Sequence, residues 1–443
     1  MPEQERVSAT SGTEVSQSLA QSTAYGIAVR ATGMASGLVV AVFLARNLEA
    51  EDLGAYQGVL SICIILGGLA ASTAERPASR RIAALDDHDR TGLPAEIGVA
   101  HLVVGTAMFA IVVVLLLASL APGVPEATRV TMRLAALVAP GVAVLSLRQW
   151  IALPLQGVAA SLGPEQIAQP IAFLGLAGLV AFHAGLGPAE ALVIYAFVGW
   201  VVWVVASWRS GLLALVRAGL RTLPSRADMR QRFSEGRPFV LLTTVGVLPV
   251  YAIVPLVATL HGLADAGRLA IAVQLTVLVA VPLQIVSLAI MPRCARLHRD
   301  DDIRGLDTLV RTASTISFVA GLGLAALLLV SLDSIVGVLG PSFAPISDLV
   351  PVLVFGQLIN AALGPNGPTL QMIGLERDAA WVETASTVVR LVAVALAAAF
   401  GSIFTVAIAI TATTILRNLL LSATLHRRVG ILTLPQLRRR RAH

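Results

Sequence analysis

The sequence predicts an all-helical, polytopic membrane protein that crosses the bilayer about twelve times. Of its 443 residues, 56% are hydrophobic and only 13% are charged, and the mean hydropathy is +0.82. A soluble globular protein carries roughly 25% charged residues. Apolar runs of about 20 residues, the length that crosses a bilayer as a helix, recur along most of the chain. A transmembrane β-barrel would show segments of about ten residues with alternating hydrophobicity instead.

The apolar runs divide the chain into two groups of six spans. A polar cytoplasmic tail over residues 1–22 contains Glu3, Glu5 and Glu14, which do not form the cationic start of a signal peptide. The first apolar run is therefore expected to stay as a helix. The predicted spans are 23–46, 53–75, 94–120, 131–157, 166–186, 189–208, 238–261, 266–291, 312–332, 346–372, 379–400 and 402–425. They form an N-terminal bundle (23–208), a basic linker (209–237), a C-terminal bundle (238–425) and a basic tail (426–443).

Arginines concentrate in alternate connections between these spans, and this asymmetry predicts the orientation. Cytoplasmic connections carry an excess of positive charge in membrane proteins. The prediction is therefore a multi-pass membrane protein with both termini in the cytoplasm. The net charge of +6 is interpreted as this topology signal, with contacts to anionic membrane lipids and no nucleic-acid partner. The arginines on the predicted cytoplasmic side are Arg76, Arg80, Arg81, Arg90, Arg209, Arg217, Arg221, Arg226, Arg230, Arg232, Arg237, Arg293, Arg296, Arg299, Arg304, Arg311, Arg377, Arg427, Arg428 and Arg438 to Arg441.

The two halves repeat weakly but at a nearly constant offset. The stretch "ARNLEAEDLGAY" falls on "ATLHGLADAGRL" when the chain is shifted by 213 residues, so that Asp52 and Gly54 meet Asp265 and Gly267. In each stretch the aspartate can cap a helix and the glycine allows a tight turn. Six spans are an even number, so both halves enter the membrane with the same orientation. A pseudo-twofold axis along the membrane normal is therefore expected, with the substrate site between the halves.

Three stretches resemble a known family. "FLARNLEAEDLGAYQGVLS", "GRLAIAVQLTVLVAVPLQIVSLAIMPRCARLHRD" and "LGPSFAPISDLVPVLVFGQLINAALGPNGPTLQMIGLERDA" are similar to helix ends and turns of polysaccharide-transport (Wzx-type) flippases of the MOP superfamily. The resemblance implies a V-shaped, MATE-like transporter with a central cavity. It implies alternating-access transport of undecaprenyl-pyrophosphate-linked oligosaccharides across the plasma membrane. The implied partners are the lipid-linked oligosaccharide and, in the same process, a polysaccharide polymerase and glycosyltransferases.

Four arginines lie inside predicted spans: Arg30, Arg148, Arg390 and Arg417. Intramembrane charges are costly and normally face a cavity or a partner. The guanidinium fork matches phosphate oxygens and stays charged, so these arginines are the candidate pyrophosphate ligands. Snorkelling to the membrane surface is the simpler explanation, above all for Arg417. Arg30 with Gly33 also resembles the Arg-x-x-Gly of lipid II flippases, whose cavity arginine binds pyrophosphate.

Other polar residues in the spans are weaker candidates. Gln274, Gln284, Gln357 and Asn360 could bind sugar hydroxyls, although hydrogen bonding between helices is the more common use. Among acidic groups, Glu383 lies seven residues before Arg390 and could pair with it. No metal-ligand cluster, phosphate-binding loop or catalytic triad is evident. The sequence therefore predicts a protein that is not an enzyme and uses no cofactor or metal.

Three alternatives stay open. A cation-coupled drug exporter of the MATE type would need acidic groups in the membrane, where this sequence offers arginines. A lipid II flippase usually carries a second arginine six residues after the first, and this position is Ser36 here. A non-transporting scaffold of polysaccharide synthesis would be distinguished by the absence of lipid-linked sugar accumulation when the protein is lost.

Overall fold

The computed structural model describes residue 26 and residues 28–85, 91–221, 224–431 and 433–435, and these ranges contain helices and no strand. The tail predicted over residues 1–22 lies outside them. In chain order the helices are Ala28–Asn47 (the first helix), α2 Ala50–Ser72, α3 Glu75–Ala83, α4 Leu93–Ser119, α5 Glu126–Gly163, a π-helix Pro164–Ala168, α6 Gln169–Ala184, α7 Pro188–Arg209, α8 Leu212–Gly219, α9 Arg226–Tyr251, α10 Ile253–Leu260, α11 Leu263–Arg299, α12 Ile303–Leu339, a 3₁₀ turn Pro341–Phe343, α13 Ile346–Leu363, α14 Asn366–Met372, α15 Glu376–Phe400 and α16 Ile403–Val429.

These helices supply the twelve predicted spans. Ten continuous helical segments of the described chain are long and apolar enough to cross a membrane. The pair α9 and α10, bent by 50°, makes an eleventh. One of the ten, Glu126–Ala184, has 59 residues, or about 90 Å at 1.5 Å per residue, which is roughly three times the thickness of the hydrocarbon core. This segment is two spans joined end to end.

The reversal between these two spans lies at Gly157. Its φ of +79° is left-handed, a conformation that glycine adopts without a steric cost. On one side of the turn, Gly141 of α5 packs against Trp200 of α7. On the other side, Gln169 of α6 packs against Gly199, the neighbour of that tryptophan. Residues before and after Gly157 therefore return to the same level along α7, which requires the chain to fold back.

Several helices differ from the predicted spans at their ends. The predictions 266–291 and 312–332 mark only the apolar parts of α11 and α12, each of which has 37 residues. Hydropathy does not detect where a helix continues into water. The span predicted over 346–372 is broken, because Gly364 has a φ of +76° and Pro365 follows it. A helix usually ends before such a pair, since proline disfavours the helical conformation of the residue preceding it.

The repeated Asp-x-Gly stretches meet at the internal symmetry axis. Gly54 of α2 packs on the backbone carbonyl of Leu263, and Gly267 of α11 packs on the carbonyl of Ala50. The 213-residue offset of the repeat relates Gly54 to Gly267 and Ala50 to Leu263, so the two contacts are equivalent. Reciprocal contacts of this kind are the signature of a twofold interface. A side chain at either glycine would collide with the opposite backbone, so this contact depends on glycine.

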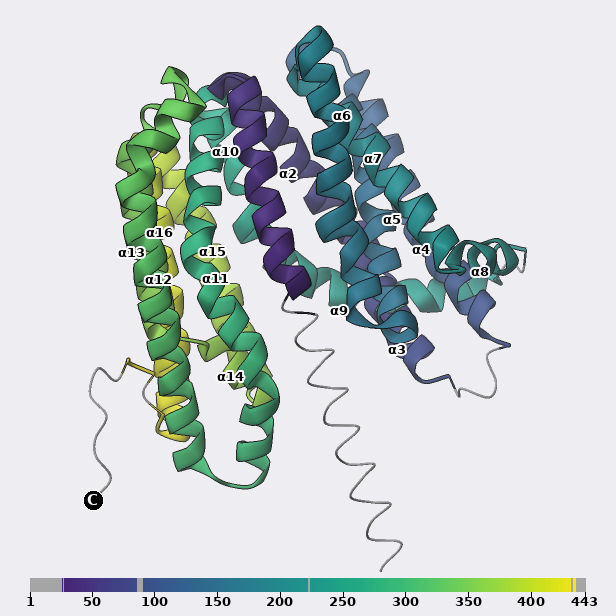
Figure 1. Cartoon of the computed structure of the whole chain (residues 1–443). Helices are drawn as coiled ribbons and strands as arrows, with labels where there is room; N and C mark the ends of the chain where they lie inside the picture. Colours follow the sequence, from purple (N-terminus) through teal and green to yellow (C-terminus); the bar gives the residue numbers. More distant parts are fainter. Residues whose placement is uncertain (1–25, 27, 86–90, 222–223, 432, 436–443) are drawn as a thin grey trace, which may run out of the picture.

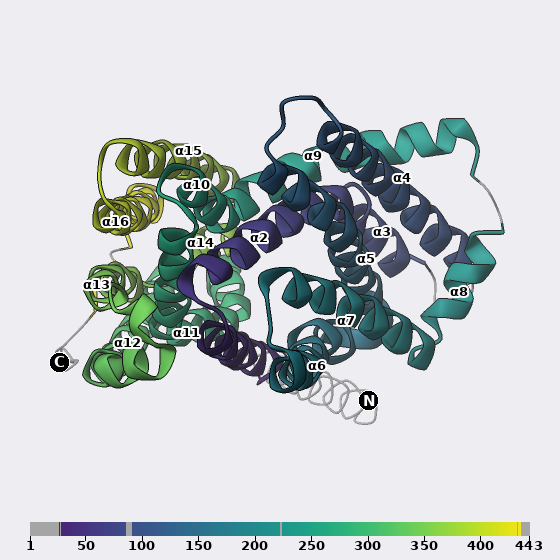
Figure 2. The same ribbon diagram turned by 90° about the horizontal axis from the view of Figure 1, so that it is seen from above.

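Two lobes result, and they are arranged as a V. In Figure 1 the N lobe (first helix to α7) and the C lobe (α9 to α16) meet near the top, where α2 contacts α10 and α11, and they diverge toward the bottom. Seen from above in Figure 2, α2, α11 and the first helix lie between the outer helices of the two lobes. The diverging end carries α3, the start of α4, α8 and the turn 300–302 between α11 and α12, and is called the arginine-rich end below.

The basic linker is anchored to the N lobe at the arginine-rich end. Arg232 of α9 donates to both carboxylate oxygens of Glu96, at 2.8 and 2.6 Å. Arg81 of α3 donates to Glu235 of α9 at 2.7 Å. Gly236 packs on the backbone of Thr73. Some arginines predicted to determine orientation therefore also hold the start of α9 against the N lobe.

Candidate functional site

Three adjoining hollows occupy the space within and between the lobes. The N-lobe pocket, about 430 Å³, is lined by the first helix, α2, α6, α7 and the π-helix, with Gln274 and Gln284 contributed by α11. The central cavity, about 900 Å³, has walls from both lobes. The C-lobe pocket, about 1040 Å³, lies between α9, α15 and α16. Arg30 lines the first two hollows and Arg417 the last two, so neighbouring hollows share an arginine in their walls.

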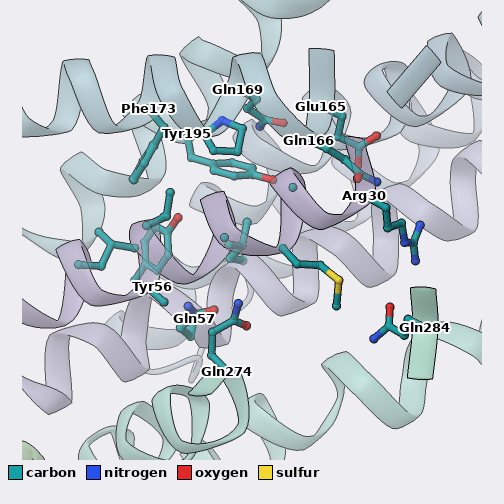
Figure 3. Close-up of a pocket in the computed structure, with 18 residues that line it drawn as sticks. Arg30, Tyr56, Gln57, Glu165, Gln166, Gln169, Phe173, Tyr195, Gln274 and Gln284 are labelled. Carbon is teal, nitrogen blue, oxygen red and sulfur yellow. The ribbon is translucent and has the colours of Figure 1, made fainter. Parts of the chain in front are cut away.

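Arg30 lies where the N-lobe pocket joins the central cavity. Its side chain is exposed, and the close-up in Figure 3 shows it at the edge of the pocket near Glu165 and Gln166. One turn further along the first helix, Gly33 packs against Gln166, where a Cβ would lie only 2.7 Å from the Gln166 Cβ. This glycine therefore allows the π-helix to approach the first helix. The Arg-x-x-Gly motif thus places an arginine beside an acidic residue of another span.

Polar groups and aromatic rings alternate along the wall of the N-lobe pocket. The hydroxyl of Tyr195 is hydrogen-bonded to Gln169. The ring of Phe173 lies between Tyr56 and Tyr195, with centroid distances of 6.5 and 6.2 Å. Amide and hydroxyl groups beside aromatic faces can bind sugar hydroxyls and also apolar surface. The pocket therefore offers a cation at its edge and neutral polar groups deeper inside.

Arg417 is firmly paired, in contrast to Arg30. Its guanidinium makes two hydrogen bonds with the carboxylate of Glu383, one of them between Nε and Oε2 at 2.6 Å and the other between Nη2 and Oε1. The expectation that Glu383 pairs with Arg390 was wrong. The two residues lie on one helix about 10 Å apart along its axis, at 1.5 Å per residue, whereas Arg417 lies opposite Glu383 on the neighbouring helix α16.

Arg390 lines the C-lobe pocket and makes few contacts. Its Nη1 is 3.5 Å from the hydroxyl of Thr414, which is a long hydrogen bond. Its Nε is buried and has no hydrogen-bond partner among the residues that the structure describes. Buried donors are normally satisfied, so this Nε has capacity for a further acceptor. An anion in the C-lobe pocket could supply the missing acceptor.

The remaining predicted residues are distributed more widely. Gln274 and Gln284 line the N-lobe pocket, and Gln284 also faces the central cavity. Asn360 lines the central cavity and donates a hydrogen bond of 3.2 Å to Gln357 on the same helix. Gln357 does not line any of the three hollows. These four residues stay predictions as sugar contacts.

Arg148 lies apart from the other three arginines. It is only 4% exposed and lines a separate hollow beside α7, together with Gln156 and Ala160. Its Nη1 donates to the carbonyl oxygen of Ala160 at 3.2 Å, just beyond the turn at Gly157. This contact ties the two spans of the reversal together. A substrate-binding role for Arg148 stays a prediction, and its position does not bring it to the Arg30 site.

Sequence reasoning missed Glu165, Gln166 and Gln169, which lie on or next to the π-helix and line the N-lobe pocket. The predicted fifth span began at residue 166, so Glu165 fell in a loop. A signal was present: the three polar side chains follow at i, i+1 and i+4, and residues four apart lie on one helical face. Short π-helical segments also occur often at functional sites.

Comparisons with known proteins agree with this architecture. A family model described as "Polysaccharide biosynthesis protein" matches residues 19–298. An inward-facing multidrug-resistance MATE transporter of the MOP superfamily superposes with a TM-score of 0.70 at 15% identity, covering 90% of this chain and 94% of that one. An outward-facing structure of such a transporter gives 0.60 at 14% identity, with 92% and 95% covered. The lipid II flippase MurJ, in an inward closed conformation, gives 0.67 at 10% identity, with 90% and 86% covered. No curated protein matches the sequence at a significant level.

The structural matches establish the fold, which is the two-lobed MATE-like fold of the MOP superfamily, as the sequence predicted. The higher score against the inward-facing MATE structure agrees with lobes that diverge at one end. The family model covers more than half of the chain. The chain therefore belongs to the polysaccharide biosynthesis protein family.

Proposed function

We propose that this protein is a flippase that moves an undecaprenyl-pyrophosphate-linked oligosaccharide across the bacterial plasma membrane by alternating access. The observation that carries the proposal is the exposed guanidinium of Arg30 at the junction of the N-lobe pocket and the central cavity. Membership of the polysaccharide biosynthesis family supports this substrate class. The two-lobed fold supports the transport mechanism.

The chemistry of the hollows suits the three parts of such a substrate. Arg30 and Arg390, one in each lobe, offer guanidinium groups to the diphosphate. The amides and hydroxyls of the N-lobe pocket offer hydrogen bonds to the sugars. The lining of α9 in the C-lobe pocket is mostly apolar, with Leu241 and Val250 exposed there, and can contact the lipid chain.

The distribution of arginines indicates the side of the membrane from which the substrate enters. Arginine-rich connections face the cytoplasm, so the end at which the lobes diverge is proposed to be cytoplasmic. The conformation described here would then accept the substrate from the side on which lipid-linked sugars are made. The reciprocal contact of Gly54 and Gly267 lies at the opposite end of α2 and α11 and closes the path outward.

Complementation tests the proposal. A strain that lacks its own oligosaccharide flippase should recover surface glycan when this protein is expressed, and its lipid-linked oligosaccharide should stop accumulating inside. Reporter fusions after Arg226 and at the C-terminus should report the cytoplasm, and fusions near Gly123 and Gly187 the outside. Insertion of the protein without any glycan export would refute the transport proposal and favour the scaffold.

A further inference from the structure

Arg76 is the contribution of the N lobe to the C-lobe pocket. It is among the arginines whose positions predict the orientation of the chain, and it is the second residue of α3. Its half-buried side chain lines the C-lobe pocket together with Arg390 and Arg417. The other residues that line this pocket belong to α9, α14, α15 and α16, so Arg76 reaches it from the opposite lobe. Besides predicting orientation, this arginine therefore presents a charge to a cavity.

Two aromatic rings hold the guanidinium of Arg76. Its Cζ lies 5.4 Å from the ring centroid of Trp150 on α5 and 6.0 Å from that of Phe239 on α9. A guanidinium stacks on aromatic rings through its flat face, and its N–H groups point outward in the plane. Phe239 follows Pro238, which lines the pocket. The rings therefore fix the cation at the pocket and leave its N–H groups available to an acceptor.

Arg76 keeps hydrogen-bonding capacity for a ligand. Its Nε is buried and has no acceptor among the residues that the structure describes. The adjacent Glu75 attracts it electrostatically, but the Oε2 of that carboxylate accepts a hydrogen bond of 2.8 Å from the hydroxyl of Ser146. Arg81 on the same helix is by contrast paired with two carboxylates, at 3.3 and 2.7 Å. Helix α3 thus carries one arginine that is paired and one that can still bind an anion.

Arg76 and Arg390 lie at two levels of the C-lobe pocket. Arg76 contacts Phe239 near the arginine-rich end, where the start of α9 is anchored. Arg390 follows Thr387 by one helical turn, and the hydroxyl of Thr387 donates to the carbonyl oxygen of Val245 at 3.4 Å. Val245 comes six residues after Phe239, which is a rise of about 9 Å along α9. The two guanidinium groups therefore mark the mouth and the interior of the pocket.

The wall between these levels is apolar. Leu241 and Leu242 of α9 line the pocket, and their side chains are 68% and 48% exposed. Among the other charged residues of the lining, Arg417 is neutralised by Glu383, and Glu376 lies exposed at the start of α15. A ligand that suits this lining carries an anion on an apolar chain, as a lipid phosphate does.

We infer that the C-lobe pocket binds lipid phosphate at two positions in series, and that Arg76 forms the outer position, through which the diphosphate of the substrate passes on its way to Arg390. The inference rests on the proposed function and adds a path of entry to it. No covalent bond is made or broken in this step. Because Arg76 stabilises the anion on the path and not in its final position, it lowers the barrier to entry and to exit alike.

Binding kinetics test the outer position. The association rate, the dissociation rate and the Kd of tritiated farnesyl diphosphate are measured on the purified full-length protein in detergent. Arg76→Gln should slow association and dissociation together, by up to about tenfold for one lost charge-assisted contact, and should leave the Kd nearly unchanged. Arg390→Ala should instead weaken binding mainly through faster dissociation.

Arg80→Gln is the matched control. Arg80 also lies over Phe239, with its Cζ 5.1 Å from the ring centroid, but it does not line the C-lobe pocket. Its replacement removes the same charge from the same helix, so the rates should equal those of wild type. Arg76→Lys keeps the charge and loses the fork, and intermediate rates are expected. This variant keeps the inference testable if Arg76→Gln does not fold.

The outcomes separate this inference from the proposed function. Rates of Arg76→Gln equal to those of wild type would overturn the outer position and leave the proposed function intact. A higher Kd caused by faster dissociation alone would place Arg76 in the final site, and the serial arrangement would fail. Failure of wild type to bind farnesyl diphosphate would refute the diphosphate site of the proposed function and the inference with it.

A competition experiment distinguishes the two sources of lipid phosphate. Phosphatidylglycerol and phosphatidylcholine are added separately to the wild-type protein before farnesyl diphosphate. Neither lipid should slow association to the rate of Arg76→Gln. If phosphatidylglycerol does so and phosphatidylcholine does not, the outer position belongs to anionic membrane lipid, and the inference that it receives the substrate is overturned.

Discussion

The two lobes contain the same kinds of charged residue in opposite states. In the N lobe, Arg30 is exposed, and no carboxylate of a described residue lies within ion-pair distance of it. In the C lobe, Arg417 is held by two hydrogen bonds to Glu383, while Arg390 has a buried donor without a partner. An arginine that is already paired must lose that partner before it can bind an anion. Location in a cavity therefore does not by itself make an arginine a ligand. We expect Arg30 and Arg390 to contribute more to diphosphate binding than Arg417 does.

The largest effect is expected at Arg30. A hydrogen bond to a charged group contributes about 1.5–3 kcal/mol, so Arg30→Ala should reduce export or diphosphate affinity by roughly ten- to a hundredfold. Arg30→Lys keeps the charge but loses the fork, and should recover only part of the activity. Complementation with matched protein levels measures both variants. Full export by Arg30→Ala would mean that this arginine is structural.

Arg390 should come next. The guanidinium of Arg390 already donates one hydrogen bond to Thr414. We therefore expect Arg390→Ala to reduce diphosphate affinity by about tenfold, the lower limit given for Arg30. Thr414→Val is the matched control, because it removes the hydroxyl and leaves the guanidinium in place. Diphosphate affinity of the purified variants is the measurement. An effect of Thr414→Val as large as that of Arg390→Ala would contradict direct binding by the arginine.

The pair Arg417 and Glu383 should show non-additive effects. Arg417→Ala removes a guanidinium that is already neutralised and leaves a carboxylate without its partner in the cavity, so a loss of about three- to tenfold is expected from repulsion of the diphosphate. Removing both side chains should restore most of the affinity, since no unpaired charge is left. A double-mutant cycle measures this coupling. Strictly additive losses would show that Arg417 contacts the substrate directly.

Arg148 should have the smallest effect on binding and a clear effect on stability. Its side chain is buried and bonds the Ala160 carbonyl. Arg148→Ala should lower the free energy of unfolding by about 1–3 kcal/mol, because that carbonyl and the reversal at Gly157 lose a contact. Thermal denaturation in detergent and diphosphate affinity are measured on the same sample. Unchanged stability with reduced diphosphate affinity would show that Arg148 binds the substrate.

The sequence by itself determined the class of the molecule. Its apolar runs predicted the twelve spans, and the shared offset of Gly54 and Gly267 predicted the two related halves. Hydropathy and a repeat offset are local or pairwise properties of the chain, so they can be read without coordinates. The prediction that Arg30, Arg390 and Arg417 lie in a cavity follows from the cost of burying a charge in lipid, and all three line hollows of the structure.

Only the tertiary structure decided which charges meet. Glu165 lines the same pocket as Arg30 because a π-helix after a reversed span packs on Gly33, and no spacing in the sequence expresses that proximity. Glu383 shares a helix with Arg390 but pairs with Arg417, because facing helices bring side chains closer than two turns of one helix do. Electrostatic interactions depend on distance in space, and in a protein of twelve spans that distance depends on which helix faces meet.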